Sequence, residues 1–417
     1  MTNEVLQKIA SDEQNISSSN GLEAKAPLLR FRKFTHPWRQ EKLSDFTSRI
    51  MRKNSNNETE LPLTISSKDG LVDQVTFFNK KVSSKDMSGY YLLKNGEFAY
   101  NKSYSNGYDF GSIKRLERYE MGALSTLYIC FSLKKHCSDY IKHYFDSLKW
   151  YRQIYIISAE GARNHGLLNV PTDDFFATIH FLSPDIEEQK KIADFLSLID
   201  QRIEKQRQLV ENLKKYKRGL FLKLYNDSEK KGYKICDLGK YCATGALSKD
   251  DIDASGKYPC ILYGELFTKY GEVIKQVASR TNIIPTYLSG TNEILFPSST
   301  TADAQSLIFP SSLKIKNIFL GGDLFTIKLK NEFDSDFISY LVNFKYKNTL
   351  ARYAQGITII HLHYTDIKEQ VIDIPNVNTQ FNISSVMRKI ETIIEMNSNE
   401  LNSLLLMKKG FLQKMFI

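Results

Sequence analysis

The clearest pattern along the chain is a run of apolar residues spaced three and four positions apart between residues 184 and 225. Such positions line one face of a helix, and their alternation is typical of a coiled-coil seam. The sequence therefore predicts one long helix over this segment. Its seam positions are Ile192, Leu196, Ile199, Ile203, Val210, Leu213, Leu220 and Leu224.

The same pattern returns near the end of the chain. Residues 184–225 match residues 375–416 without a gap, at an offset of 191. Self-similarity at a fixed period indicates a repeated structural unit. The chain is therefore predicted to consist of two similar halves, each ending in a long helix. Matched positions include Pro184/Pro375, Gln189/Gln380, Asp200/Glu391, Ile203/Ile394, Lys217/Lys408 and Gly219/Gly410.

Both copies interrupt the seam with polar residues at the same two places. Gln206 and Lys217 do so in the first copy, and Asn397 and Lys408 in the second. A polar residue in a seam lowers stability but fixes register. We expect the helices to pack antiparallel about a pseudo-twofold axis, with Gln206 facing Asn397 near the crossing point. The alternative is that both amides lie at the edge of the seam.

Two segments of mixed pattern precede the two helices. Short apolar runs separated by glycine, asparagine and serine predict strands and turns, and two longer runs predict short helices. We therefore expect an α+β fold, in which two repeated α/β domains are joined and spaced by an antiparallel intramolecular coiled coil. Predicted strands are 96–100, 124–131, 175–182, 293–296 and 324–329, and predicted short helices are 139–151 and 334–346.

These elements divide the 417 residues into five parts. A polar leader at 1–26 precedes a first domain at 27–183 and a first long helix at 184–232. A second domain at 233–374 and a second helix at 375–417 repeat that order.

The net charge points to a polyanionic partner. The chain has 57 basic and 47 acidic residues, a formal charge of +10. Residues 27–183 hold 23 basic and 16 acidic residues, whereas residues 233–374 hold 15 of each. Nucleic acid is therefore the leading class of partner. We expect the first domain to contribute most of the salt-dependent binding, and the second to rely on shape and on locally clustered cations.

Other chemistry is sparse in this sequence. The five cysteines lack CxxC spacing, which predicts reduced thiols and a cytoplasmic protein. No apolar run approaches the roughly 20 residues needed to span a bilayer, and the first residues do not resemble a signal peptide. His361 and His363 have no further ligands at zinc-site spacing, so no metal is expected.

One stretch and several shorter ones resemble a known family. Residues 182–203 read Leu-Ser-Pro-Asp-Ile-Glu-Glu-Gln-Lys-Lys-Ile-Ala-Asp-Phe-Leu-Ser-Leu-Ile-Asp-Gln-Arg-Ile, and residues 213–220 read Leu-Lys-Lys-Tyr-Lys-Arg-Gly-Leu. Together they resemble the central conserved region of the DNA specificity subunit of type I restriction-modification systems. The resemblance extends over nearly the whole chain, through residues 29–38, 96–102, 263–271 and 297–301. The second helix departs from the family pattern at Phe381, Asn382, Ser384 and Ser385.

The resemblance implies a non-catalytic subunit. Two target recognition domains would each read half of a bipartite, asymmetric site in double-stranded DNA, and the paired helices would space them. The stripe from Ile192 to Leu224 spans roughly 50 Å, between one and two turns of B-DNA. Implied partners are two copies of a modification (methyltransferase) subunit and a restriction subunit. S-adenosylmethionine, ATP and Mg would belong to those partners, and none would be bound by this chain.

Polar and basic loop residues are the candidates for DNA contact, because base edges need projecting side chains and phosphates need cations or small donors. In the first domain they are Asn101, Lys102, Tyr104, Tyr108, Lys114, Arg115, Arg163, Asn164 and His165. In the second they are Tyr263, Lys269, Ser298, Ser299, Thr300, Thr301 and His361.

Two other classes of function are an enzyme and a coiled-coil scaffold. A nuclease is suggested by Pro184-Asp185 with Glu188 and Lys190, but these residues open a helix, where acids favour the positive end of the dipole. A methyltransferase would need a glycine turn for its cofactor and a Pro-Pro loop, and no two prolines are adjacent. A coiled-coil scaffold or stand-alone DNA-binding protein is the remaining alternative. Sequence-specific methylation with an added modification subunit would exclude the scaffold.

Overall fold

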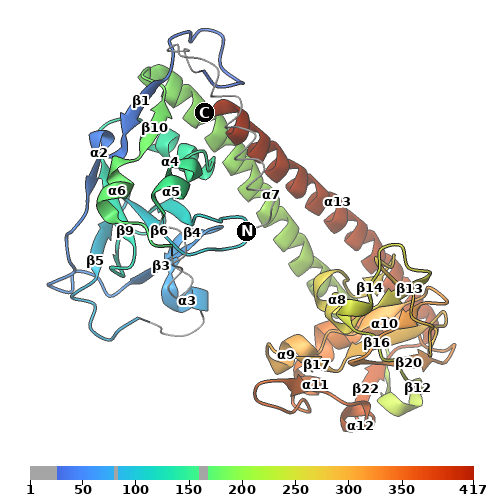
Figure 1. Cartoon of the computed structure of the whole chain (residues 1–417). Helices are drawn as coiled ribbons and strands as arrows, with labels where there is room; N and C mark the ends of the chain where they lie inside the picture. The colour runs from blue at the N-terminus through green and yellow to red at the C-terminus, as the bar shows by residue number, and fades with distance from the viewer. Residues whose placement is uncertain (1–25, 79–82, 159–167) are drawn as a thin grey trace. The chain divides into compact units, whose positions relative to one another are not determined.

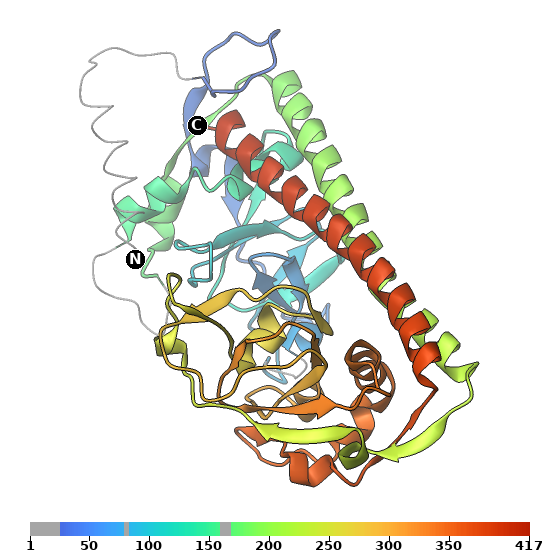
Figure 2. The ribbon, with the colours of Figure 1, turned by 90° about the vertical axis from the view of Figure 1, so that its right-hand side faces the viewer.

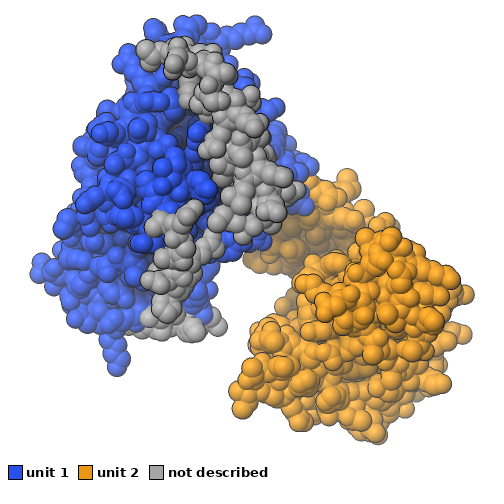
Figure 3. Space-filling model, in the orientation of Figure 1, with its two compact units in different colours: residues 1–206, 400–417 blue, residues 207–399 orange. Residues whose placement is uncertain are grey.

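The computed structural model describes residues 26–78, 83–158 and 168–417. The chain forms two compact units (Figure 3): the first holds Met1–Gln206 with Glu400–Ile417, and the second holds Arg207–Asn399. The two predicted long helices are present as α7 (Ile186–Asn226) and α13 (Val377–Met415). Each contributes one half to each unit (Figure 1).

The long helices run antiparallel within each unit, as predicted (Figure 2). In the first unit the start of α7 packs against the end of α13, where Ile192 and Leu404 share one buried cluster. In the second unit the end of α7 packs against the start of α13, where Phe221 shares a cluster with Ile383 and Met387. Predicted seam residues of α7 therefore form the helix contact in the first unit, whereas in the second unit Phe221, which lies outside the predicted seam, takes that place.

The buried stripe shifts by one position near the end of each copy. Phe221 and Tyr225 are buried, whereas the predicted Leu220 and Leu224 are only half-buried. The equivalent Leu412 and Phe416 are buried in the second copy. The shift arises because the last turns also pack against a globular domain: Phe416 contacts the rings of Trp38, Tyr140 and Tyr144.

The two seam lysines lie in repeat-related ion pairs. Lys408 Nζ lies 2.6 Å from Asp200 in the first unit, and Lys217 Nζ lies 3.1 Å from Glu391 in the second. Because Asp200 matches Glu391 in the repeat, the same pair forms twice with the helices exchanged. Gln206 and Asn397 belong to different units, so their predicted pairing stays a prediction.

The first unit contains two four-stranded sheets. One sheet has the order β2-β9-β6-β7 and the other β4-β3-β8-β5. The first comprises β2 (Thr47–Arg49), β9 (Ile129–Leu133), β6 (Phe98–Asn101) and β7 (Ser112–Arg115). The second comprises β4 (Gly70–Asp73), β3 (Pro62–Ser66), β8 (Met121–Leu124) and β5 (Tyr91–Lys94). The helices are α2 (Leu43–Phe46), α3 (Gln74–Phe78), α4 (Ser138–Asp146), α5 (Tyr151–Ile157) and α6 (Thr172–Ala177).

The second unit has a five-stranded sheet of order β12-β20-β16-β18-β14 and a smaller sheet, β15-β13-β19. The five strands are β12 (Gly239–Ala243), β20 (Leu324–Leu329), β16 (Glu293–Pro297), β18 (Ser311–Leu313) and β14 (Val273–Ile274). The smaller sheet comprises β15 (Ser279–Thr281), β13 (Tyr258–Ile261) and β19 (Phe319–Leu320). The helices are α8 (Tyr263–Thr268), α9 (Ala304–Leu307), α10 (Ser335–Leu341), α11 (Lys347–Ala351) and α12 (Tyr364–Ile367). Two 3-10 turns, Ile235–Asp237 and Lys249–Asp251, complete it.

Equivalent strands carry the cores of the two domains. In the first, Phe98 of β6 pairs with Phe131 of β9, and their rings stack with centroids 5.5 Å apart. In the second, Phe296 of β16 pairs with Phe325 of β20, with centroids 5.0 Å apart. The two domains therefore repeat a core motif that the sequence comparison of the helices did not cover.

Each domain begins and ends at one two-stranded ladder. β1 (Arg39–Lys42) pairs antiparallel with β10 (Ile179–Leu182), directly before α7. β11 (Lys231–Lys234) pairs in the same way with β22 (Val371–Ile374), directly before α13. The chain thus enters and leaves each domain at one place.

A matched glutamine joins each long helix to its domain. Gln189 Oε1 accepts a hydrogen bond of 2.8 Å from the backbone N–H of Cys137, at the start of α4. Gln380 Oε1 accepts one of 2.9 Å from the N–H of Asp334, at the start of α10. These contacts satisfy backbone donors that a helix start would otherwise leave open.

Some predicted elements differ from those observed. The strands expected at 293–296 and 324–329 are confirmed. The strand expected at 175–182 is wrong in its first part, because Pro171 and two acidic residues begin the helix α6 there. The stretch 124–131 divides between β8 and β9 around a turn. The helix expected at 334–346 changes to a π-helical turn at Val342–Tyr346.

Candidate nucleic-acid interface

The second domain brings five of the predicted DNA-contacting residues together. β17 (Ser299–Thr300) pairs with β21 (Ile360–His361), which places Ser299 opposite His361. The flanking Ser298 accepts a backbone hydrogen bond from Leu362, and Thr301 follows β17 as an exposed residue. Residues 298–301 and His361 therefore lie together at what we call the β17–β21 surface, although Ser299 itself is buried.

Local hydrogen bonds hold this surface in place. The N–H of Ser298 donates to Asp323 O at 2.8 Å, and Ser299 Oγ donates to Asp323 Oδ2 at 3.3 Å. The N–H of Ala302 donates to Thr300 Oγ1 at 3.1 Å. The loop is thus braced by its own backbone and by Asp323, while His361 and Thr301 remain exposed.

A tight hairpin extends the β17–β21 surface. The N–H groups of Gln355 and His361 each donate to the other residue's carbonyl oxygen, at 2.8 and 2.7 Å. Gly356 has a φ of +128°, and a Cβ there would lie 2.0 Å from Ile359 O, so only glycine fits. At the tip, the Ile357 side chain is 100% exposed. Our sequence reasoning omitted Ile357, because an isolated apolar loop residue gives no signal for nucleic-acid binding.

Tyr263 and Lys269 belong to a different element of the second domain. Tyr263 begins α8 and is partly exposed. Lys269 Nζ lies 2.6 Å from Glu265 Oε1 and 3.0 Å from Ser279 Oγ. The lysine is therefore already paired with a carboxylate, and its contact with DNA stays a prediction.

The first domain presents a loop directly after β6. Asn101 Oδ1 accepts a hydrogen bond from the N–H of Ser103 at 3.0 Å, which turns the chain at the end of the strand. Tyr104 is exposed, and Tyr108 is half-buried with its ring centre 5.5 Å from Lys114 Nζ. Lys102 is half-buried beside this loop.

Lys114 and Arg115, also candidates for DNA contact, are held in ion pairs. Lys114 Nζ lies 2.7 Å from Asp146 Oδ1, and Arg115 Nη2 lies 2.5 Å from Asp139 Oδ1. The two side chains are only 14% and 12% exposed. They join β7 to α4, so their charge is largely neutralised within the domain. The remaining first-domain candidates, Arg163, Asn164 and His165, lie outside the described residues.

The residues that the structure describes contain neither a candidate metal site nor a candidate membrane span. No group of three or more histidine, cysteine or acidic residues there has the geometry to hold a metal ion. No helix among the described residues is long and apolar enough to cross a membrane.

The described residues thus form two similar α+β domains, each attached to a pair of long helices. Residues 227–406 match the family model described as "Type I restriction modification DNA specificity domain". This second part of the chain is therefore similar to the DNA specificity domains of that family.

Solved structures agree with this fold. The S subunit of a type I restriction-modification system from M. genitalium aligns with a TM-score of 0.54 at 14% identity, over 94% of this chain and 99% of that one. A second chain, from a study of complex assembly and conformational transition of the type I R-M system, aligns with a TM-score of 0.53 at 14% identity. That alignment covers 91% of this chain and 97% of the other. No protein with a curated description matches the sequence.

Proposed function

We propose that this chain is a specificity subunit that reads a bipartite, asymmetric target in double-stranded DNA, with one half-site bound by each domain. It would confer that specificity on both the adenine methyltransferase and the restriction endonuclease assemblies. The observation that carries the proposal is the duplication: each domain attaches to the helix pair through an equivalent strand ladder and an equivalent glutamine contact. Two equivalent domains attached to one pair of helices are what a target with two separated half-sites would require.

The test is to map methylation by the chain combined with its modification subunit. Replacing the exposed pair Thr301→Ala and His361→Ala should alter or weaken only one half of the methylated sequence. The matched first-domain variant, Lys102→Ala with Tyr104→Ala, should alter only the other half. Methylation at no defined sequence by the unaltered complex, or loss of both halves in either variant, would refute the proposal.

We also propose two copies of the modification subunit as partners. The support is a pair of repeat-related apolar residues exposed on the long helices: Tyr216 on α7 is 59% exposed, and Met407 on α13 is 42% exposed. Exposed apolar positions on a helix suit a partner helix. Native mass spectrometry should find two modification subunits per chain, and Tyr216→Ser or Met407→Ser should each weaken binding of one copy. A single copy in the unaltered complex would contradict this stoichiometry.

The reactions themselves would take place on the partners. We propose that S-adenosylmethionine is bound by the modification subunit, and ATP and Mg by the restriction subunit, in a complex that acts in the cytoplasm. The purified chain alone should neither methylate nor cut DNA. Activity of the purified chain would overturn this division of labour.

A further inference from the structure

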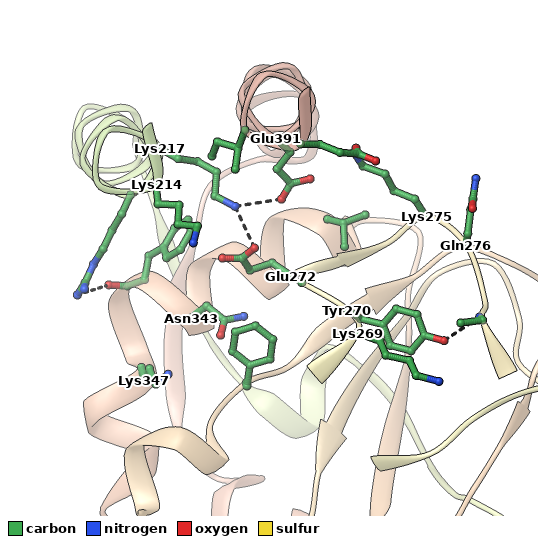
Figure 4. A pocket seen from close by; sticks show the side chains of 18 of the residues that line it. Lys214, Lys217, Lys269, Tyr270, Glu272, Lys275, Gln276, Asn343, Lys347 and Glu391 are labelled. Carbon is green, nitrogen blue, oxygen red and sulfur yellow. Dashed lines mark hydrogen bonds and ion pairs between the residues drawn. The ribbon is translucent and has the colours of Figure 1, made fainter. Parts of the chain in front are cut away.

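A basic pocket of about 1080 Å³ lies in the second unit. Its walls come from α7, α13 and the segments around β14 and α11, and they carry six basic and three acidic residues. The second domain has no net charge by sequence, so a local excess of cations there is informative. In Figure 4, Lys214 and Lys347 lie on one side of the pocket, and Glu272 and Glu391 gather around Lys217.

Each acid in the pocket already holds a cation. Lys217 Nζ lies 2.9 Å from Glu272 and 3.1 Å from Glu391, and Lys275 Nζ lies 2.8 Å from Glu395. Arg218 and Lys347 are left over. Among the described residues, neither of them has a carboxylate oxygen within 4.0 Å. The site therefore has two cations that no protein carboxylate neutralises closely.

Arg218 is exposed, whereas the surroundings of Lys347 are unfavourable for positive charge. Arg218 Nη2 donates to the carbonyl oxygen of Phe344 at 3.5 Å, three residues before Lys347. Lys347 is half-buried, with Nζ 5.7 Å from the ring centre of Phe309. Burial lowers the pKa of Lys347, the charge of Asp303 raises it in part, and the charge of Arg218 lowers it again, so that the net direction is downward. A bound anion would counter both lowering effects.

The backbone before Lys347 is also unusual. The π-helical turn Val342–Tyr346 leads directly into α11, and such turns are rare and frequent at functional sites. Within it, Asn343 is buried and its amide donates to Pro310 O and Ser339 O at 2.8 and 2.9 Å. Asn343 is one of the residues that line the pocket, and its Oδ1 is buried without a hydrogen-bond partner in the structure.

The leftover cations are continuous with the β17–β21 surface. Asp303, the N-cap of α9, follows Thr301 by two residues and interacts electrostatically with Lys347. Helix α9 packs against β17, β21 and α11, so it connects the β17–β21 surface to the helix that carries Lys347.

We propose that Arg218 and Lys347 form a phosphate-binding site, and that its ligand is the DNA backbone beside the half-site read by the second domain. The site would position the duplex without reading bases, because contacts to phosphate carry no sequence information directly. It would also assign DNA contact to α7, a helix otherwise expected only to space the domains. This inference rests on the proposed function.

The test measures binding of the specific duplex by the complex with the modification subunit, at several salt concentrations. Each lost phosphate contact should reduce the slope of log Kobs against log[salt] by about 1. Arg218→Gln with Lys347→Gln should therefore make the slope shallower by about 2 and leave the methylated sequence unchanged. The matched control is Lys215→Gln with Lys345→Gln, which removes two exposed lysines from the same segments and should leave the slope unchanged.

Thermal unfolding separates this role from a structural one. Because Lys347 is half-buried beside a like charge, Lys347→Gln should leave the melting temperature unchanged or raise it. A lower melting temperature for that variant, or a salt slope equal to that of the unaltered complex, would overturn the proposal.

A further measurement shows whether the ligand of the site is DNA phosphate or a free anion. If inorganic phosphate raises the melting temperature of the unaltered chain but not of the double variant, while both bind DNA with equal slopes, the ligand is a small anion and the DNA assignment is wrong. Failure of the proposed function looks different, since the unaltered complex would then bind no specific duplex at all.

Discussion

The two units build the same ion pair but complete it differently. In the first unit, Lys408 pairs with Asp200 and lies 3.8 Å from Asp146, which itself pairs with Lys114. In the second unit, Lys217 alone serves both Glu391 and Glu272. The helix-to-helix part belongs to the repeat, whereas the third partner comes from each globular domain. The pair of long helices is therefore the same in both units, whereas each domain binds to it through a different charged residue.

The largest expected effect follows from this difference in the number of cations between the two units. Lys217→Met would leave two half-buried carboxylates, 18% and 12% exposed, without a cation, which costs at most about 3–5 kcal/mol. Lys408→Met should cost clearly less, because Asp146 keeps Lys114 and Asp200 is 29% exposed. Urea unfolding of the two variants measures the difference. Lys215→Met, an exposed neighbour on α7, is the control and should change the free energy of unfolding by less than about 0.5 kcal/mol. Equal losses for Lys217 and Lys408 would remove the proposed asymmetry.

The second largest effect is a difference between the two units in stability at low pH. Burial lowers the pKa of His143 to about 4 and that of His180 to about 3, and both belong to the first unit. The folded unit therefore binds fewer protons than the unfolded chain between pH 6.5 and about 4. Its stability is full above pH 6.5 and falls as the pH drops through that window, by about 3 kcal/mol for His143 alone. In the second unit both histidines are exposed. Burial also raises the pKa of Glu391, so we expect acid to lower the stability of that unit less.

Tryptophan fluorescence can follow this difference, because Trp38 and Trp150, the two tryptophans of the chain, both lie in the first unit. We expect an acid transition that appears in fluorescence at a higher pH than in circular dichroism, which reports both units. His143→Asn should reduce the pH dependence of the fluorescence transition. Coincident transitions by the two probes would argue against unequal acid stability.

The smallest effect concerns base reading by the hairpin of the second domain. Ile357→Ser should leave the melting temperature unchanged, because the side chain packs against nothing. It should weaken discrimination in one half-site by about 1 kcal/mol if the side chain contacts a base in the groove. Methylation sequencing measures this, with Ile284→Ser as the matched control, since Ile284 is 77% exposed on another loop. Equal methylation profiles for the two variants would exclude Ile357 from base reading.

The helices could be predicted from sequence because their signal is local and occurs twice. The ion pairs of Lys217 and Lys408 also follow from the repeat, once the helices are known to run antiparallel. Strands such as β16 and β20 were found because each is a short apolar run between turn residues.

The arrangement of the loops could not be predicted in the same way. Lys114 and Arg115 looked like free cations, since nothing near them in the sequence reveals that α4 folds against β7. The pairing of Ser299 with His361 depends on contacts between distant segments, and so does the approach of the π-helical turn before α11 to α7. Residue type alone therefore overestimates the number of cations available to DNA and does not locate the ones left unpaired.

The paired strands at the boundary of each domain have a consequence for how such a protein changes. Since β1 lies beside β10, and β11 beside β22, each domain is an insertion whose two ends meet at the helical frame. A whole domain could be exchanged for another between the two strands of its ladder. The entropy cost of bringing these strands together depends only weakly on the length of chain between them. A new half-site could thus be acquired in one recombination step, while the frame and the other half-site stay as they were.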